Sequence, residues 1–196
     1  MKIFAEIYNW FMKGYNMDIL SLDKSIMLFI QEYIRCDAIT LPVTFITHLG
    51  DKGLIWIVLV GILLALKNTR QIGKYAVLSL ALCGAVGNLI KVFVMRPRPF
   101  LEIEELMPLV ARPDSYSFPS MHTACAFAVT LVALKMGEGK WRYWLLTFAV
   151  IVSLSRIYVG VHYTSDVLAG FLLGALSSYV AVKLAKKQNL DEPSIE

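Results

Sequence analysis

The sequence YAVLSLALCGAVGNLI, residues 75–90, decides the fold, because none of its sixteen positions carries a charged side chain. Four more uncharged runs occur in the chain, at residues 53–66, 115–134, 143–155 and 167–182. A helix of sixteen residues is about 24 Å long, shorter than the ~30 Å hydrocarbon core of a bilayer. Each run must therefore recruit flanking residues. We expect an all-α, polytopic membrane bundle with about five transmembrane helices.

The composition also indicates a membrane protein. Hydrophobic residues make up 57% of the 196 positions and charged residues only 17%, with a mean hydropathy of +0.61. A soluble domain cannot bury so much apolar surface. The net charge of +4 is small and dispersed, which excludes a basic nucleic-acid-binding arm. The chain has an odd number of cysteines, Cys36, Cys83 and Cys125, and two of them lie in apolar runs. We therefore expect neither a disulfide framework nor a Cys-based zinc site.

The lysines and arginines between the runs predict which end of the bundle faces the cytoplasm. Nine of them gather in three short segments: Lys67, Arg70 and Lys74; Lys135, Lys140 and Arg142; and Lys183, Lys186 and Lys187. We expect these segments to be cytoplasmic. Residues 91–119 and 156–166 then share the extracytoplasmic face, which carries almost all the unusual polar side chains.

The first fifty residues have a different pattern, with charges every few positions among aromatic and aliphatic residues. Such a composition is typical of helices that lie in the membrane interface. The first twenty residues do not resemble a cleavable signal peptide. We divide the chain into an interfacial helical segment (1–50), a membrane domain (51–187) and a polar tail (188–196).

The first polar cluster of the extracytoplasmic face ends the second run. Lys91 precedes the sequence RPRP at residues 96–99. The two prolines disfavour continued helix, so the chain is expected to leave the membrane near Met95. Lys91 then lies in the last helical turn, where a lysine can also simply complement the helix dipole. Arg98 follows in a rigid cationic turn suited to an anion.

The second cluster, SFPSMHT at residues 117–123, opens the third run. A Pro-Ser start leaves free backbone N–H groups and a hydroxyl at a helix N-terminus, where anions bind favourably. Ser120 alone is equally explained as a helix cap. His122 adds a titratable side chain to the same turn.

The third cluster contains Ser155, Arg156, His162 and Asp166. His162 and Asp166 are four positions apart, so on a helical start they share a face and the carboxylate can orient the imidazole. A buried ion pair is the alternative. Charged side chains beside membrane runs are costly unless they have a partner or a role.

Together the clusters supply three cations, two histidines, one carboxylate and a helix N-terminus. This set suits a phosphoryl group, whose transfer depends mainly on positioning and electrostatics. One histidine can attack phosphorus while the other protonates the leaving group. No carboxylate cluster for Mg²⁺ or Ca²⁺ accompanies them, so we expect no metal and no cofactor.

In this order, K-x6-R-P (residues 91–99), P-S-x-H (119–122) and S-R-x5-H-x3-D (155–166) resemble the three-part signature of the type 2 phosphatidic acid phosphatase family. The resemblance covers roughly residues 45–185. It implies an α-helical membrane enzyme that removes phosphate from lipid phosphates or diphosphates without metal. By this resemblance His162 is the nucleophile that forms a phosphohistidine, Asp166 orients it, and His122 is the general acid. The phosphate-binding set is then Lys91, Arg98, Ser120, Met121 and Arg156, with Met121 where the commonest motif has Gly.

Several alternatives stay open at this point. The expected substrate is undecaprenyl diphosphate, or else phosphatidylglycerophosphate or phosphatidic acid. A vanadium haloperoxidase has a similar site, and a non-catalytic lipid-phosphate binder or transporter is possible. The sequence leaves the oligomeric state open. The other polar residues have weaker interpretations. Arg96 is either a solvated loop residue or an extension of the substrate-facing charge, and His48 is an interfacial or packing residue. Glu102, Glu104 and Glu105 are interpreted as surface charges, and Arg112 and Asp114 are left without a role.

Overall fold

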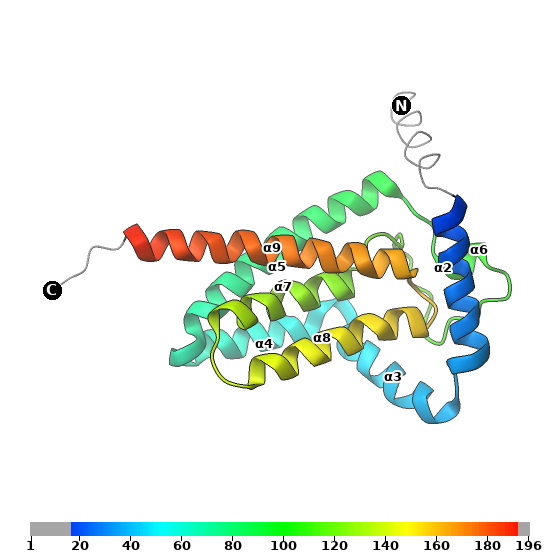
Figure 1. Cartoon of the computed structure of the whole chain (residues 1–196), viewed down its shortest axis with the longest axis horizontal. Coiled ribbons are helices and arrows are strands. Elements are labelled where there is room, and N and C mark those ends of the chain that lie inside the picture. The colour runs from blue at the N-terminus through cyan, green and yellow to red at the C-terminus, as the bar shows by residue number, and fades with distance from the viewer. Residues whose placement is uncertain (1–16, 192–196) are drawn as a thin grey trace.

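The computed structural model describes residues 17–191, and within this range the chain is helical without a strand. The elements are α2 (Met17–Phe29), the π-helix η1 (Ile30–Ile34), α3 (Asp37–Leu49), the 3-10 turn η2 (Asp51–Gly53), α4 (Leu54–Ala65), the 3-10 turn η3 (Lys67–Thr69), α5 (Arg70–Val94), α6 (Pro99–Glu102), α7 (Met121–Met136), α8 (Trp141–Tyr158) and α9 (Thr164–Asp191). In Figure 1, α4, α5, α7, α8 and α9 run along the long axis of the bundle, and α2 lies across one end. The expected all-α membrane bundle is confirmed.

All five uncharged runs fall on helices, namely α4, α5, α7, α8 and α9. By length and composition two segments can cross a membrane alone, Lys67–Glu102 around α5 and Thr164–Lys187 in α9. The pair α3 and α4, bent by 57°, makes a third if it is one span. By length and hydropathy, fewer helices can cross a membrane than the five expected from the sequence. Helices α4 and α7 are too short, with 12 and 16 residues, and α8 carries an arginine near each end that lowers its hydropathy.

Helix α7 begins at Met121, directly after the Pro-Ser pair where the sequence predicts a helix start, so residues 115–120 of the third run are not helical. Residues 115–120 instead form a connection whose backbone is held by other segments. The Ser117 N–H donates to the Arg96 carbonyl (2.9 Å), and the Ser120 N–H donates to the Asp166 carbonyl (3.0 Å). These contacts bring the starts of α7 and α9 together.

Helix α7 is the centre of the bundle and packs against α5, α8 and α9. Most of its residues are small and buried, which suits a helix surrounded by others. Gly170 and Gly174 let α9 approach it closely. A Cβ at either position would lie 2.5 Å from a carbonyl oxygen of the α7 side, that of Ser120 or Ala124. Small residues four apart allow this packing in membranes, where apolar burial does not drive helices together.

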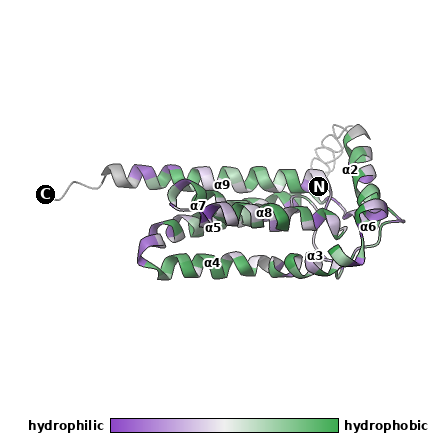
Figure 2. Ribbon diagram, turned by 60° about the horizontal axis from the view of Figure 1, so that its bottom comes forward, coloured by the Kyte–Doolittle hydropathy of each residue, from purple (hydrophilic) through white to green (hydrophobic). Residues whose placement is uncertain are grey.

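The outer surface is apolar along the helices and polar at their ends. Large exposed hydrophobic side chains lie on α4, α5, α8 and α9. Figure 2 shows this hydrophobic length, with hydrophilic residues at the α4–α5 turn and towards the end of α9. The α4–α5 and α7–α8 turns and the end of α9 all lie opposite α2 (Figure 1). The three basic segments thus share one end of the bundle, as the positive-inside count requires.

Helix α2 lies across the other end of the bundle, beside α6 (Figure 1). Met27 of α2 is buried in a cluster with Ile103, Leu106 and Tyr163, so the helix is anchored to the membrane domain. Residues 1–16 of the expected interfacial segment, and residues 192–196 of the expected tail, lie outside the described range. The division at residue 50 falls at the α3–α4 bend and stays a prediction.

Candidate active site

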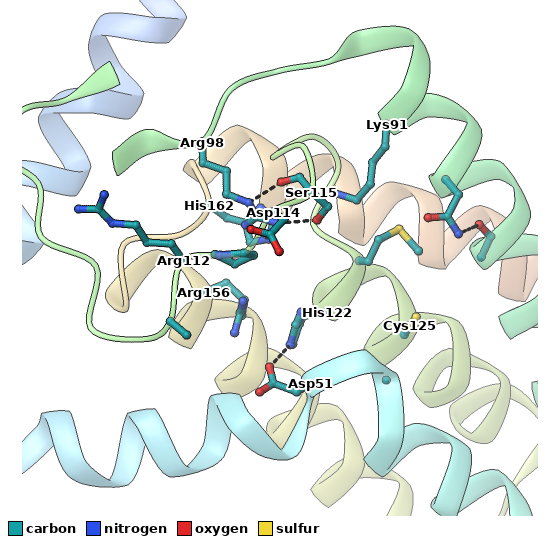
Figure 3. A pocket seen from close by; sticks show the side chains of 16 residues that line it. Asp51, Lys91, Arg98, Arg112, Asp114, Ser115, His122, Cys125, Arg156 and His162 are labelled. Carbon is teal, nitrogen blue, oxygen red and sulfur yellow. Dashed lines mark hydrogen bonds and ion pairs between the residues drawn. The ribbon is translucent and has the colours of Figure 1, made fainter. Parts of the chain in front are cut away.

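A cavity of about 700 Å³ lies among the helix ends and connections that carry the three sequence motifs. Its walls come from η2, α5, the connection before α7, the first turn of α7, α8 and the α8–α9 connection. The polar side chains among its lining are Asp51, Asn88, Lys91, Arg98, Arg112, Asp114, Ser115, His122, Arg156 and His162. Figure 3 shows that these come from segments far apart in sequence. A site of this size is typical for a ligand larger than inorganic phosphate.

His162 lies in the α8–α9 connection and is almost fully buried, with 2% of its surface exposed. Its Nδ1 is 3.5 Å from Oδ2 of Asp166, and its Nε2 is 3.3 Å from Nη1 of Arg98. Burial lowers the pKa of His162 from 6.5 to about 3, with Arg98 and Arg156 acting in the same direction and Asp166 opposing them. The imidazole is therefore neutral near pH 7. With the proton on Nδ1, towards Asp166, Nε2 keeps its lone pair.

Asp166, in the first turn of α9, is held from three sides. Its Oδ1 accepts a hydrogen bond from Nη1 of Arg96 (2.7 Å). Its Oδ2 accepts one from the Tyr163 N–H (3.0 Å) and another from the Ser117 hydroxyl. Such donors keep a buried carboxylate ionised and fixed in orientation. The predicted proximity of Asp166 to His162 is thus observed, with the pair separated slightly beyond hydrogen-bond length.

The expectation for Arg96 is wrong in both its forms. Arg96 is 5% exposed and is absent from the cavity lining, so it is neither solvated nor an extension of the substrate-facing charge. Its guanidinium bridges Asp166 to Asp23 of α2 (Nη2–Oδ2 3.0 Å) and stacks over Tyr163 at 3.9 Å. Two buried carboxylates attract it inward, because a buried cation needs such partners. Arg96 therefore supports the site from behind.

Lys91 and Arg98 are buried cations on the cavity wall. Lys91, in the last turn of α5, donates to the Tyr116 carbonyl. Arg98 donates to the Ser115 carbonyl (Nε, 2.7 Å) and the Val161 carbonyl (Nη1, 2.9 Å). These bonds fix the two cations on the connections that flank His162.

Arg156 and His122 form the opposite wall, below His162 in Figure 3. Nη1 of Arg156 donates to the Thr47 hydroxyl (2.5 Å), and its buried Nε has no hydrogen-bond partner. His122 places Nε2 3.2 Å from Oδ1 of Asp51, and Oδ2 of Asp51 is 2.8 Å from Nδ1 of His48. Arg156 and His122 thus each line the cavity while being held by a side chain of the α3–η2 segment.

Sequence reasoning missed Asp51 and Thr47, and it treated His48 only as an interfacial or packing residue. A signal for Asp51 was present. It lies two residues before the uncharged run at residues 53–66, and an acidic side chain beside a membrane run is costly without a partner. This is the reasoning that selected Asp166.

Ser120 and Met121 differ in their relation to the cavity. Ser120 is fully buried, its hydroxyl accepts from Thr123 (3.1 Å), and it does not line the cavity. Met121 lines it, with its side chain in the space above Gly87, where a Cβ would lie 2.4 Å from its Sδ. A phosphate contact by either residue stays a prediction.

Arg112 and Asp114, left without a role by the sequence, both line the cavity. The Arg112 guanidinium points away from the Arg98–His162 group in Figure 3, towards Phe100 at 5.5 Å. Six of the eight predicted site residues line the cavity: Lys91, Arg98, Met121, His122, Arg156 and His162. Asp166 and Ser120 lie behind it.

The chain resembles a known protein family and several known proteins. The PAP2 superfamily matches residues 73–190. An undecaprenyl-diphosphatase of Sulfolobus acidocaldarius is 37% identical over 142 residues, covering 71% of this chain and 68% of that protein. Phosphatidylglycerophosphatase B of Bacillus subtilis is 32% identical over 145 residues, covering 68% of each.

Two solved structures share the fold. The crystal structure of a transmembrane PAP2 type phosphatidylglycerolphosphate phosphatase from Bacillus subtilis superposes with a TM-score of 0.72 at 27% identity, covering 94% of this chain and 93% of that one. The crystal structure of Aquifex aeolicus LpxE gives the same TM-score and identity over 81% of this chain and 93% of that one. With its helical membrane bundle, its cavity of cations and histidines and these relatives, the chain belongs to the PAP2 superfamily of membrane lipid phosphatases.

Proposed function

We propose that this phosphatase hydrolyses a lipid diphosphate, most of all undecaprenyl diphosphate, through a phosphohistidine on His162. The observation that carries the proposal is the geometry around His162. Its Nδ1 faces the fixed carboxylate of Asp166 at 3.5 Å, and its Nε2 lies 3.3 Å from a guanidinium nitrogen of Arg98. Burial lowers the pKa of His162 to about 3, which favours the neutral imidazole that such an attack needs. A nucleophilic nitrogen and a donor for phosphate oxygens are therefore neighbours.

In the first step, Nε2 of His162 attacks phosphorus as the bond from phosphorus to the leaving oxygen breaks. The leaving oxygen keeps the electron pair and takes a proton from His122. Lys91, Arg98 and Arg156 stabilise the charge on the equatorial oxygens. In the second step, water that has given a proton to His122 attacks the phosphohistidine. The N–P bond breaks, and inorganic phosphate and free His162 are released.

We propose that these steps need no metal ion. Three cations supply the positive charge that Mg²⁺ provides in other phosphoryl-transfer sites. We expect the phosphatase activity to persist in EDTA and to be inhibited by vanadate.

The substrate proposal is supported by the relatives and by the shape of the site. An undecaprenyl-diphosphatase and a phosphatidylglycerophosphatase are both among the similar proteins. The cavity has room for more than one phosphate group. It opens at the end opposite the basic segments, which the positive-inside rule assigns to the extracytoplasmic face. Recycled undecaprenyl diphosphate arrives in that leaflet, whereas phosphatidylglycerophosphate and phosphatidic acid are made on the other side.

A panel assay on purified protein tests this proposal. Phosphate release is measured from undecaprenyl diphosphate, phosphatidylglycerophosphate and phosphatidic acid in the same micelles. We expect kcat/KM to be highest for the diphosphate and expect His162→Ala to abolish turnover of all three. Fastest hydrolysis of phosphatidylglycerophosphate would contradict the substrate, and full activity of His162→Ala would contradict the mechanism.

A further inference from the structure

Asp51 is a carboxylate of the cavity wall that the three motifs do not include. It lies in η2, at the bend between α3 and α4, and 51% of its side chain is exposed. One oxygen is 3.2 Å from Nε2 of His122 and the other is 2.8 Å from Nδ1 of His48. Figure 3 shows the Asp51 side chain directed at the His122 ring. The contact joins two segments 71 residues apart in the chain.

The same bend also fixes the His122 ring sterically. Gly50 has no Cβ, and one built there would lie 2.8 Å from Cδ2 of His122. The ring therefore lies directly against the backbone that precedes Asp51. Thr47, one turn earlier on α3, holds Arg156. The end of α3 and the turn after it thus orient two side chains of the site.

The charges around His122 explain why a carboxylate is useful there. Burial disfavours a protonated His122 imidazole most, and the charges of Arg156 on α8 and Arg98 after α5 act in the same direction, whereas Asp51 opposes all three. A general acid must carry its proton when the leaving oxygen departs. The charged and titratable side chains that line the same cavity are Lys91, Arg98, Arg112, Asp114, Arg156 and His162, with Asp166 behind His162. Asp51, which also lines the cavity, is the carboxylate that contacts the His122 ring, at 3.2 Å from Nε2.

We propose that Asp51 is a positioning residue for His122, holding the imidazole in place and favouring its acid form, as Asp166 positions His162. The proposal rests on the proposed function, because it assumes that His122 protonates the leaving group. It divides the site into two carboxylate–histidine pairs. The Asp166 pair serves the attack on phosphorus, and the Asp51 pair serves departure of the leaving oxygen.

Leaving-group dependence separates this role from a structural one. A lipid monophosphate such as phosphatidic acid releases an alkoxide, which needs a proton, whereas p-nitrophenyl phosphate releases a stable phenolate. We expect Asp51→Asn to lower kcat on phosphatidic acid by about 10- to 100-fold, within the range of general acid catalysis. The first-turnover release of p-nitrophenolate, the step that needs no proton from His122, should stay within about 3-fold of the wild-type rate. The alkaline limb of the phosphatidic acid pH profile should move to lower pH, because the imidazole loses the neighbour that favours its proton.

Three further variants sharpen the experiment. Asp37→Asn removes an exposed carboxylate of the first turn of α3 and should leave both rates unchanged. Gly50→Ala should displace the His122 ring and reproduce the substrate selectivity of Asp51→Asn without removing a charge. In a His122→Ala background, Asp51→Asn should cause no additional loss.

A direct titration completes the test without relying on turnover. The chain has three histidines, so ¹⁵N-histidine NMR in micelles can assign the His122 signal with a His122→Gln variant. We expect His122 to lose its proton at lower pH in Asp51→Asn than in the wild type. An unchanged titration, or equal losses on both substrates with an unmoved alkaline limb, would overturn the inference. Inactivity of the wild type on every phosphate ester would instead refute the proposed function.

Discussion

Replacing Asp166 by Asn is the substitution whose effect the structure specifies most closely. Asp166 is fully buried and accepts hydrogen bonds from Arg96, the Tyr163 N–H and the Ser117 hydroxyl, with Nδ1 of His162 3.5 Å away. Asparagine keeps the shape but has one acceptor oxygen, and its amide turns two N–H donors towards groups that are themselves donors. Either orientation leaves donors unsatisfied.

The magnitude follows from these contacts. Removing one partner of a buried ion pair costs about 3–5 kcal/mol. Arg96 keeps its second carboxylate, Asp23, so we expect about 3 kcal/mol of destabilisation. For activity, an amide in place of a carboxylate that orients a catalytic histidine costs up to ~10⁴-fold in kcat. The 3.5 Å separation here is longer than a hydrogen bond, so we expect on the order of 10³-fold, about 4 kcal/mol of transition-state stabilisation.

The assay measures phosphate release in detergent micelles and thermal unfolding of the same samples. We expect kcat to fall while KM stays within about 3-fold, because Lys91, Arg98 and Arg156 are untouched. The matched control is Asp23→Asn, which removes the other carboxylate of Arg96 but has no contact with His162. It should lose stability and less than about tenfold in kcat. Equal losses of kcat in the two variants would show that the Arg96 network, and not the orientation of His162, controls activity.

Three further predictions concern packing, pH and topology. Gly87→Ala should push the Met121 side chain into the cavity and lower kcat/KM by about tenfold, since overpacking costs about 1–3 kcal/mol. Adding Met121→Ala to this variant should restore kcat/KM. Wild-type kinetics of Gly87→Ala would contradict the contact between Gly87 and Met121. The unfolded chain binds a proton on His162 below pH 6.5, whereas the folded chain binds it only near pH 3, so the free energy of unfolding should decrease by about 1.4 kcal/mol for each unit by which the pH is lowered between these values. Tm of His162→Gln should therefore depend less on pH than Tm of the wild type. Parallel curves of Tm against pH would contradict this prediction. Glu104 and Glu138 are both exposed and lie at opposite ends of the predicted topology. In a Cys-free background, an impermeant maleimide added to intact cells should label Glu104→Cys and leave Glu138→Cys unlabelled. The reverse labelling would place the site in the cytoplasm.

Much of the fold could be predicted from the sequence, because uncharged runs of helical length have few alternatives in a membrane. The lengths of the helices could not. Residues 115–120 belong to the uncharged run at 115–134, yet the N–H groups of Ser117 and Ser120 donate to the backbones of Arg96 and Asp166, so this part of the run is not helical. The close packing of α7 and α9 depends on Gly170 and Gly174, whose effect requires knowing which helix they face.

The functional site, like the fold, could be predicted only in part. Residues within the motifs, such as His162 and Arg98, could be predicted because a short spacing and the chemistry of each side chain identify them. The partners of Asp51 and Asp23 could not be predicted, because each contacts a residue more than 70 positions away. Arg96 shows the same limit. Its charge suggested a substrate contact, but two distant carboxylates draw it behind the cavity.

Trapping the covalent intermediate tests the central claim most directly. In His122→Ala, p-nitrophenyl phosphate can still phosphorylate the nucleophile because its leaving group needs no proton, while release of the phosphoryl group by water is slowed. Rapid quenching followed by peptide mass spectrometry should find an acid-labile, base-stable phosphoryl group on His162, absent from His122→Ala/His162→Ala. Turnover without any phosphorylated protein, or a phosphoryl group on another residue, would contradict His162 as the nucleophile.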